Sequence, residues 1–86
     1  MQYIYNTKGT CSRQIIIDVD DNGIIENATF VGGCNGNLQG INALVKGLAI
    51  DEVIARLSGI KCGFKPTSCP DQLAVALKQI KEKKEN

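Results

Sequence analysis

The chain has 86 residues, 43% hydrophobic and 22% charged, which suits one small globular domain. The formal net charge is +1 and the lysines form no basic stripe, which argues against nucleic acid as a partner. The N-terminus lacks a secretory signal pattern, and no stretch approaches the ~18 apolar residues that cross a bilayer. We therefore expect one cytoplasmic domain over residues 1–86, with no membrane contact and a frayed, charged tail over about 81–86.

The first part of the chain predicts a three-stranded antiparallel meander. Residues 11–19 are rich in isoleucine and valine that alternate toward one face, as in a half-buried strand. The next four residues, DDNG, end in the Asn-Gly pair typical of a tight hairpin turn. Shorter strands are expected at residues 3–5, before a turn at 6–9, and at residues 24–31, after the hairpin.

The spacing of the hydrophobic residues then becomes helical. Three helix faces are predicted: Leu38, Ile41, Val45 and Leu48; Ile50, Val53, Ile54 and Leu57; and Leu73, Ala76, Leu77 and Ile80. Pro70 suits the first turn of the last helix, with Ser68 or Cys69 at the cap position. Strands followed by helices predict an α+β fold, in which about three helices pack on one face of the antiparallel meander.

Four cysteines are the chemically notable residues of this histidine-free chain: Cys11, Cys34, Cys62 and Cys69. In a reducing cytoplasm, such cysteines more often indicate metal binding or thiol chemistry than structural disulfides. No CxxC pair occurs, so the spacing alone gives little support to a metal site. Cys11 is expected at the start of the second strand beside a turn, Cys34 between the third strand and the first helix, Cys62 in a loop, and Cys69 at the start of the last helix. Two of them therefore gain from helix N-termini, where thiolates are favoured.

The sequence GGCNGN at residues 32–37 surrounds Cys34 with glycines. Backbone without side chains can curl around a sulfur or a bound ligand and donate N–H groups to it, so Gly33 is a candidate cofactor-binding residue. The alternative is an ordinary glycine-rich turn from strand to helix that contains a small buried cysteine.

The pentapeptide TSCPD at residues 67–71, together with GGCNGN, resembles the TSCPD domain family over nearly the whole chain. Related domains occur at the C-terminal end of some large ribonucleotide reductases, where their cysteine clusters are interpreted as metal-binding. The resemblance therefore implies a metal ion as ligand and a ribonucleotide reductase as a partner, but it implies no reaction.

A second resemblance, over roughly residues 9–80, is to iron–sulfur cluster scaffold proteins of the NifU/IscU type. The similar features are Cys11, GIIENATF at residues 23–30, Gly33-Cys34, VKGLAIDE at residues 45–52, and Cys69 at the start of the last helix. This resemblance implies that Cys11, Cys34 and Cys69 converge at one end of the fold and ligate a metal or cluster.

Two departures from those scaffolds affect the implied site. Arg13 stands where the scaffolds carry an aspartate, and Ser68 stands where they carry a histidine ligand. Cys62 could replace that histidine, giving four cysteine ligands that suit zinc or an iron–sulfur cluster equally well. Arg13 would then offset the charge of four thiolates, or it is simply a solvent-facing strand residue.

Three functions follow from these observations. The first is a non-enzymatic metal-binding module, holding zinc or an iron–sulfur cluster for structure or for transfer to an iron–sulfur client protein. The second is an interaction domain that serves a ribonucleotide reductase, and the third is a thiol redox protein with Cys62 and Cys69 as its pair. The absence of histidine, of a Walker loop and of paired carboxylates argues against hydrolase chemistry.

Overall fold

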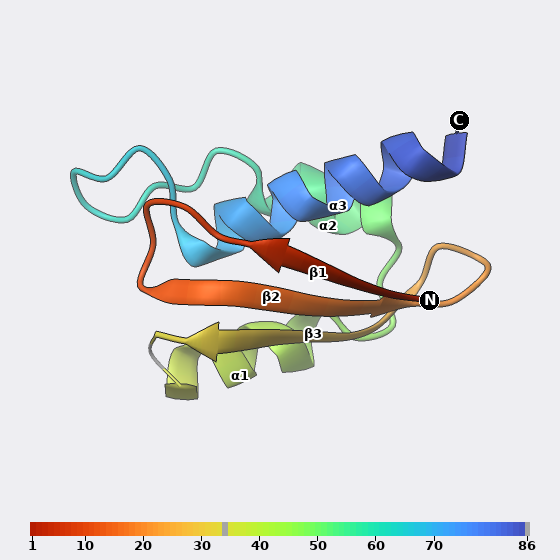
Figure 1. The fold of residues 1–86 in the computed structure, drawn as a ribbon, viewed down its shortest axis with the longest axis horizontal. Helices are drawn as coiled ribbons and strands as arrows, with labels where there is room; N and C mark the ends of the chain where they lie inside the picture. The colour runs from red at the N-terminus through yellow and green to blue at the C-terminus, as the bar shows by residue number, and fades with distance from the viewer. Residues whose placement is uncertain (34, 86) are drawn as a thin grey trace.

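The structure is a computed structural model that describes residues 1–33 and 35–85 (Figure 1). Its elements in chain order are β1 (Gln2–Asn6), β2 (Ser12–Val19), β3 (Ile25–Gly32), α1 (Asn35–Val45), α2 (Ile50–Leu57) and α3 (Cys69–Glu85). The strands form one antiparallel sheet in the order β1-β2-β3. The predicted α+β fold, a three-stranded meander followed by three helices, is confirmed.

One face of the sheet carries the core. Alternate residues of β2 are fully buried, and all three helices add side chains to the same hydrophobic cluster. The buried members of this cluster are Ile15, Ile17, Val19, Ile25, Ala28, Val45, Ile50, Val53, Leu73, Ala76, Leu77 and Ile80. Because every helix contributes to one cluster, the helices cover a single face, with α2 against α3 and α1 along β3 (Figure 1).

The hairpin between β2 and β3 follows the predicted turn. The Asp20 carboxylate accepts hydrogen bonds from the N–H groups of Asn22 (2.8 Å) and Ile24 (3.0 Å). Gly23 has φ +77°, a left-handed conformation that costs glycine little. The DDNG sequence therefore forms the turn through a local side-chain cap and one permissive residue.

The first helix is shorter than its hydrophobic pattern suggests. α1 ends at Val45, and Leu48 lies beyond it although it still packs against the core. The reason is a backbone connection to β3: Gly47 donates to the carbonyl of Ile25 (2.8 Å), and Ile25 donates to the carbonyl of Leu48 (2.9 Å). Gly47, with φ +84°, allows the chain to leave the helix and make these bonds.

A β-bulge changes the direction of side chains at the start of β2. Ser12 pairs with Gly32 and Gln14 pairs with Val31, so Arg13 is one extra residue in β2. The extra residue reverses the alternation: Ser12 is buried, whereas Arg13 is exposed. Ser12 therefore joins the helix-covered side of the sheet at the end where α3 begins.

Candidate functional site

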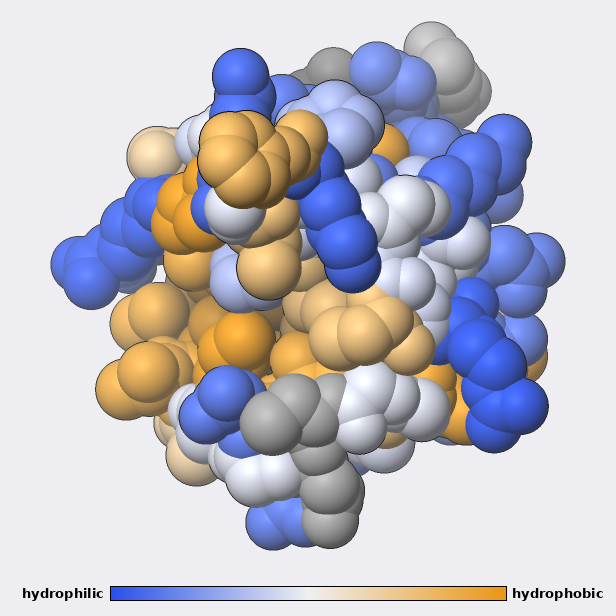
Figure 2. Space-filling model, turned by 90° about the vertical axis from the view of Figure 1, so that its left-hand side faces the viewer, coloured by the Kyte–Doolittle hydropathy of each residue, from blue (hydrophilic) through white to orange (hydrophobic). Residues whose placement is uncertain are grey.

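Two cysteines separated by 58 positions meet at one end of the sheet. Cys11 ends the loop between β1 and β2, and Cys69 is the first residue of α3. Their sulfur atoms lie 3.7 Å apart. Cys11 is exposed, whereas Cys69 is only 7% exposed, so Cys11 is the more accessible residue of the pair. Figure 2 shows this end of the molecule, where hydrophobic side chains form a band bordered by hydrophilic ones.

Hydroxyl groups stabilise the thiolate form of Cys69. Its Sγ lies 3.2 Å from the Oγ of Ser12, which in turn lies 3.2 Å from the hydroxyl of Thr10. Burial raises the pKa of the Cys69 thiol, but hydrogen bonds from the Ser12 side chain and backbone, from Cys11 and from Thr10 together lower that pKa below its ordinary value. The site therefore makes it easier for Cys69 to lose its proton and become a thiolate, the form that binds metals and attacks electrophiles.

The residues around Cys69 in the pentapeptide build the start of α3. Ser68 is the N-cap: its Oγ accepts the N–H of Asp71 (3.2 Å) and donates to the carbonyl of Ile60 (2.6 Å). The Asp71 carboxylate accepts hydrogen bonds from the Thr67 hydroxyl (2.5 Å) and from the N–H of Gly59 (2.7 Å). These bonds, that of Thr67 first, lower the pKa of Asp71. The pentapeptide thus connects the preceding loop to α3 by hydrogen bonds and holds Cys69 at the first position of that helix.

A buried glutamine connects the two segments that carry Cys11 and Cys69. Gln72 Oε1 accepts hydrogen bonds from the Tyr5 hydroxyl (3.2 Å) and from the N–H of Lys8 (3.0 Å). Its amide nitrogen donates to Thr67 (3.1 Å). Gln72 therefore holds the β1–β2 loop against the first turn of α3. Our sequence reasoning did not single out Gln72, Ser12 or Thr10, because each acts through a partner distant in the sequence or through the bulge.

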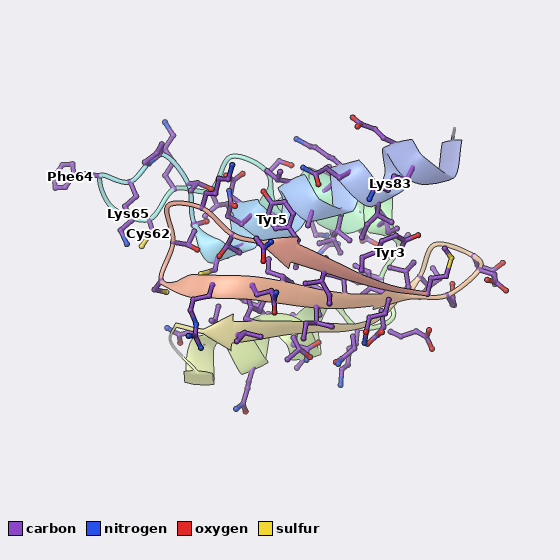
Figure 3. All side chains as sticks on the ribbon, viewed as in Figure 1. Tyr3, Tyr5, Cys62, Phe64, Lys65 and Lys83 are labelled. Atoms are coloured by element: carbon purple, nitrogen blue, oxygen red, sulfur yellow. The ribbon has the colours of Figure 1, made fainter. Side chains whose placement is uncertain are left out.

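Cys62 lies near the pair without joining it. It is exposed in the loop between α2 and α3, and its N–H donates to the carbonyl of Thr67 (3.2 Å). Cys62, Cys11 and Cys69 line the same small cavity of about 30 Å³, and Figure 3 shows Lys65 beside Cys62. Across residues 1–33 and 35–85, no three cysteine or carboxylate side chains lie close enough together to hold a metal ion.

The glycine turn approaches the pair through Gly33. Its φ is +79°, and a Cβ at this position would lie 3.0 Å from Cys11 Sγ and 3.1 Å from the backbone nitrogen of Ser12. Gly32 similarly lies along the exposed side chain of Arg13. The next residue, Cys34, falls outside the described residues. The ligand role of Cys34 and the cofactor-binding roles of Gly33 and Arg13 stay predictions.

Comparison with known proteins identifies a family. No curated protein and no solved structure matches the chain, so the likeness to NifU/IscU-type scaffolds stays a prediction from sequence. No helix within the described ranges combines the length and apolar character needed to cross a bilayer. The family model of the TSCPD domain matches residues 3–81, a span that runs from the second residue of β1 to the last turn of α3. The chain therefore belongs to the TSCPD domain family.

Proposed function

We propose that this protein is a non-enzymatic metal-binding module in which Cys11 and Cys69 are the first two thiolate ligands. The observation that carries the proposal is the 3.7 Å separation of their sulfur atoms. Two thiolates on one tetrahedral metal with metal–sulfur bonds of about 2.3 Å lie about 3.8 Å apart. A disulfide would require about 2.05 Å. The two sulfurs thus have the spacing of ligands that share one metal atom.

Cys62 and Cys34 are the ligands that would complete a four-cysteine site. Cys62 already lines the cavity beside the pair, and its loop is anchored to α3 through Ser68 and Thr67. Cys34 directly follows Gly33, where an added Cβ would lie 3.0 Å from Cys11 Sγ. Cys62 must move closer to the pair to share a metal with it, because within residues 1–33 and 35–85 no three cysteine or carboxylate side chains lie close enough to hold one. Zinc and a [2Fe–2S] cluster both suit a set of four cysteines.

The hydroxyl groups of Ser12 and Thr10 support metal binding because they make the Cys69 thiol easier to deprotonate. A metal binds thiolates, so protons compete with it for Cys69. Ser12 and Thr10 lower the pKa of Cys69 and thus weaken that competition near neutral pH. Gln72 keeps the two cysteine-bearing segments together before any metal arrives. In this proposal the pair is therefore preformed, and only the remaining ligands move.

The test is metal analysis of protein purified without oxygen, combined with its visible absorption spectrum. We expect one zinc or one iron–sulfur cluster per chain, lost in Cys11→Ser and in Cys69→Ser. Cys62→Ser and Cys34→Ser decide whether the other two sulfurs are ligands. The matched control is Thr29→Ala, an exposed change on the open face of the sheet, which should retain the metal. Protein that keeps four free thiols and takes up neither Zn²⁺ nor Co²⁺ would refute the proposal.

The recipient, if the metal is transferred, is an iron–sulfur client protein or a ribonucleotide reductase. This part of the proposal rests on the family resemblance alone. Metal-loaded protein immobilised on a resin should retain such a partner, and the Cys69→Ser variant should not. Retention by both forms would mean that the partner recognises the fold without regard to the metal.

The same geometry favours thiol redox chemistry as a second candidate. The partner of Cys69 is then Cys11 and not Cys62, because Cys11 is the cysteine in sulfur contact with it. Attack of the exposed Cys11, as its thiolate, on glutathione disulfide would release one glutathione, and attack by the Cys69 thiolate on the Cys11–glutathione mixed disulfide would release the second. Peptide mapping after such treatment should find Cys11 joined to Cys69. A purely metal-binding protein would instead resist this reaction while loaded.

A further inference from the structure

The two edges of the sheet differ in how their outward backbone groups are satisfied. Along β3, the N–H of Ala28 donates to the side-chain oxygen of Asn42 (2.8 Å). The N–H and carbonyl of Ile25 bond to Leu48 and Gly47 in the turn after α1. The chain thus satisfies outward backbone groups of its β3 edge at Ile25 and Ala28, with α1 and the residues that follow it.

The β1 edge has no such cover. Val19 donates to the carbonyl of Met1 (2.9 Å) and Thr7 donates to the carbonyl of Arg13 (3.1 Å), so odd-numbered residues of β1 bond to β2. In an antiparallel ladder the intervening residues, Gln2 and Ile4, then direct their N–H and C=O groups away from β2. Within residues 1–33 and 35–85, no group bonds to these outward backbone atoms.

The sequence of β1 also lacks the usual protection of a free edge. Natural edge strands carry lysine, proline or a bulge that prevents another strand from pairing with them. The QYIYN sequence of β1 has no charge and no proline, and its register with β2 is regular throughout. Its central residue, Ile4, is 61% exposed. These features are those of a strand that is suited to accept a further strand.

A groove runs between this edge and α3. It has a volume of about 210 Å³, with Tyr3 and Tyr5 of β1 on one side and Ala76 and Ile80 of α3 on the other. Ala76 and Ile80 are themselves buried in the core, so a strand added to β1 would lie in this groove with alternate side chains against Tyr3, Tyr5 and the exposed Gln79.

The groove has a charged end. The hydrogen bond from Tyr5 to Gln72 places the first turn of α3 at the Tyr5 end of β1. At 1.5 Å per residue, Lys83 lies about 16 Å further along the helix. It also lines the groove, and Figure 3 shows it above Tyr3, toward the start of β1. A positive charge therefore marks the N-terminal end of the free edge.

We propose that the β1 edge and the facing side of α3 form a docking groove for an extended segment of a partner protein. The segment pairs antiparallel with β1, packs alternate side chains against Tyr3, Tyr5 and Gln79, and ends in an acidic residue opposite Lys83. The antiparallel direction places the C-terminal end of the segment at Lys83, because β1 begins there. This groove is separate from the cysteine pair and does not depend on the proposed metal.

The test uses a synthetic peptide of alternating threonine and valine that ends in glutamate, with blocked termini. In an NMR titration we expect shifts confined to β1 and the groove side of α3. Exchange of the outward amide of Ile4 should slow about tenfold when about 90% of the protein is bound. The amides of Tyr3 and Tyr5, already bonded to β2, should change little.

Two variants make the test specific. Ile4→Pro removes an outward N–H without removing a hydrogen bond to β2, a change that edge strands tolerate, and should abolish binding, whereas Ile4→Val should retain it. Lys83→Glu should weaken binding of the glutamate peptide and should instead bind a peptide that ends in lysine. This charge exchange tests the docking groove even if Ile4→Pro does not fold. The proposal is overturned if millimolar peptide shifts no β1 amide, or if Ile4→Pro binds normally. It is equally overturned if the Ile4 amide becomes protected by protein concentration alone, because a second copy then occupies the edge.

Discussion

Replacing Gly33 by alanine tests how the glycine turn positions the cysteine pair. Gly33 has φ +79°, a conformation that costs an alanine about 1–2 kcal/mol. The new Cβ would also lie 3.0 Å from Cys11 Sγ, 3.0 Å from Leu38 Cδ1 and 3.1 Å from the nitrogen of Ser12. These distances are shorter than the roughly 3.5–4.0 Å of favourable contacts, so overpacking adds about 1–3 kcal/mol. We expect a total loss of about 2–5 kcal/mol in the free energy of unfolding.

Two other glycines separate the contributions to that loss. Gly23 has φ +77° but open space around a Cβ, so Gly23→Ala should lose only about 1–2 kcal/mol from backbone strain. Gly40, inside α1 with open space around it, should gain about 0.5–1 kcal/mol as alanine. Urea unfolding of the reduced, metal-free proteins measures all three. If Gly33→Ala loses no more stability than Gly23→Ala, the close approach to Cys11 and Ser12 is wrong.

Three further predictions concern Cys69 and the start of α3. Ser12→Ala removes a hydroxyl that lowers the pKa of Cys69. An NMR titration of the metal-free variant should therefore give a higher pKa for Cys69 than in the parent. An unchanged midpoint would contradict the hydrogen bond between Ser12 and Cys69. Asp71 has a lowered pKa in the folded state, so its stabilisation is full above the unfolded value of about 3.9 and is lost as pH falls through the folded value. Asp71→Asn should therefore be less stable than the parent near neutral pH and lose less stability on acidification; parallel urea-unfolding curves across pH would refute this. Ser68→Ala should cost about 1–2 kcal/mol of unfolding free energy through the lost cap, while Ser68→Asp should retain most of it, and equal losses in the two variants would count against the capping role.

The fold is largely readable from the sequence where local patterns and tertiary packing agree. The alternating isoleucines of β2 and the Asn-Gly turn after it predict the hairpin, and the helical spacing from Ile50 to Leu57 matches α2. Leu48 is the instructive exception. Its spacing continues the α1 pattern, but Gly47 and the bonds to Ile25 of β3 end the helix first. Those bonds form only when β3 packs beside the helix, so the local hydrophobic pattern cannot predict that α1 ends before Leu48.

The site is only partly readable for the same reason. The sequence resemblance implies that Cys11 and Cys69 converge, and they do. Plain alternation, however, places residue 13 on the face of Ile15, which conflicts with a solvent-facing Arg13. The bulge removes that conflict, because it buries Ser12 and exposes Arg13. The bulge in β2 lies opposite Gly32 of β3, which has φ +83°. The residue with the unusual backbone conformation is therefore in β3, and the sequence of β2 alone does not predict the bulge.

The long sequence separation of Cys11 and Cys69 has a consequence for the unfolded chain. Any bond that joins them, through a metal or directly, closes a loop of 58 residues in that ensemble. In the chain-entropy description, such closure lowers the conformational entropy of the unfolded chain and raises its free energy by about 4 kcal/mol at room temperature. The sheet and the last helix would then be tied as one cross-linked unit. An 86-residue domain with a small aliphatic core would thereby owe a large share of its resistance to unfolding to the state of two sulfur atoms.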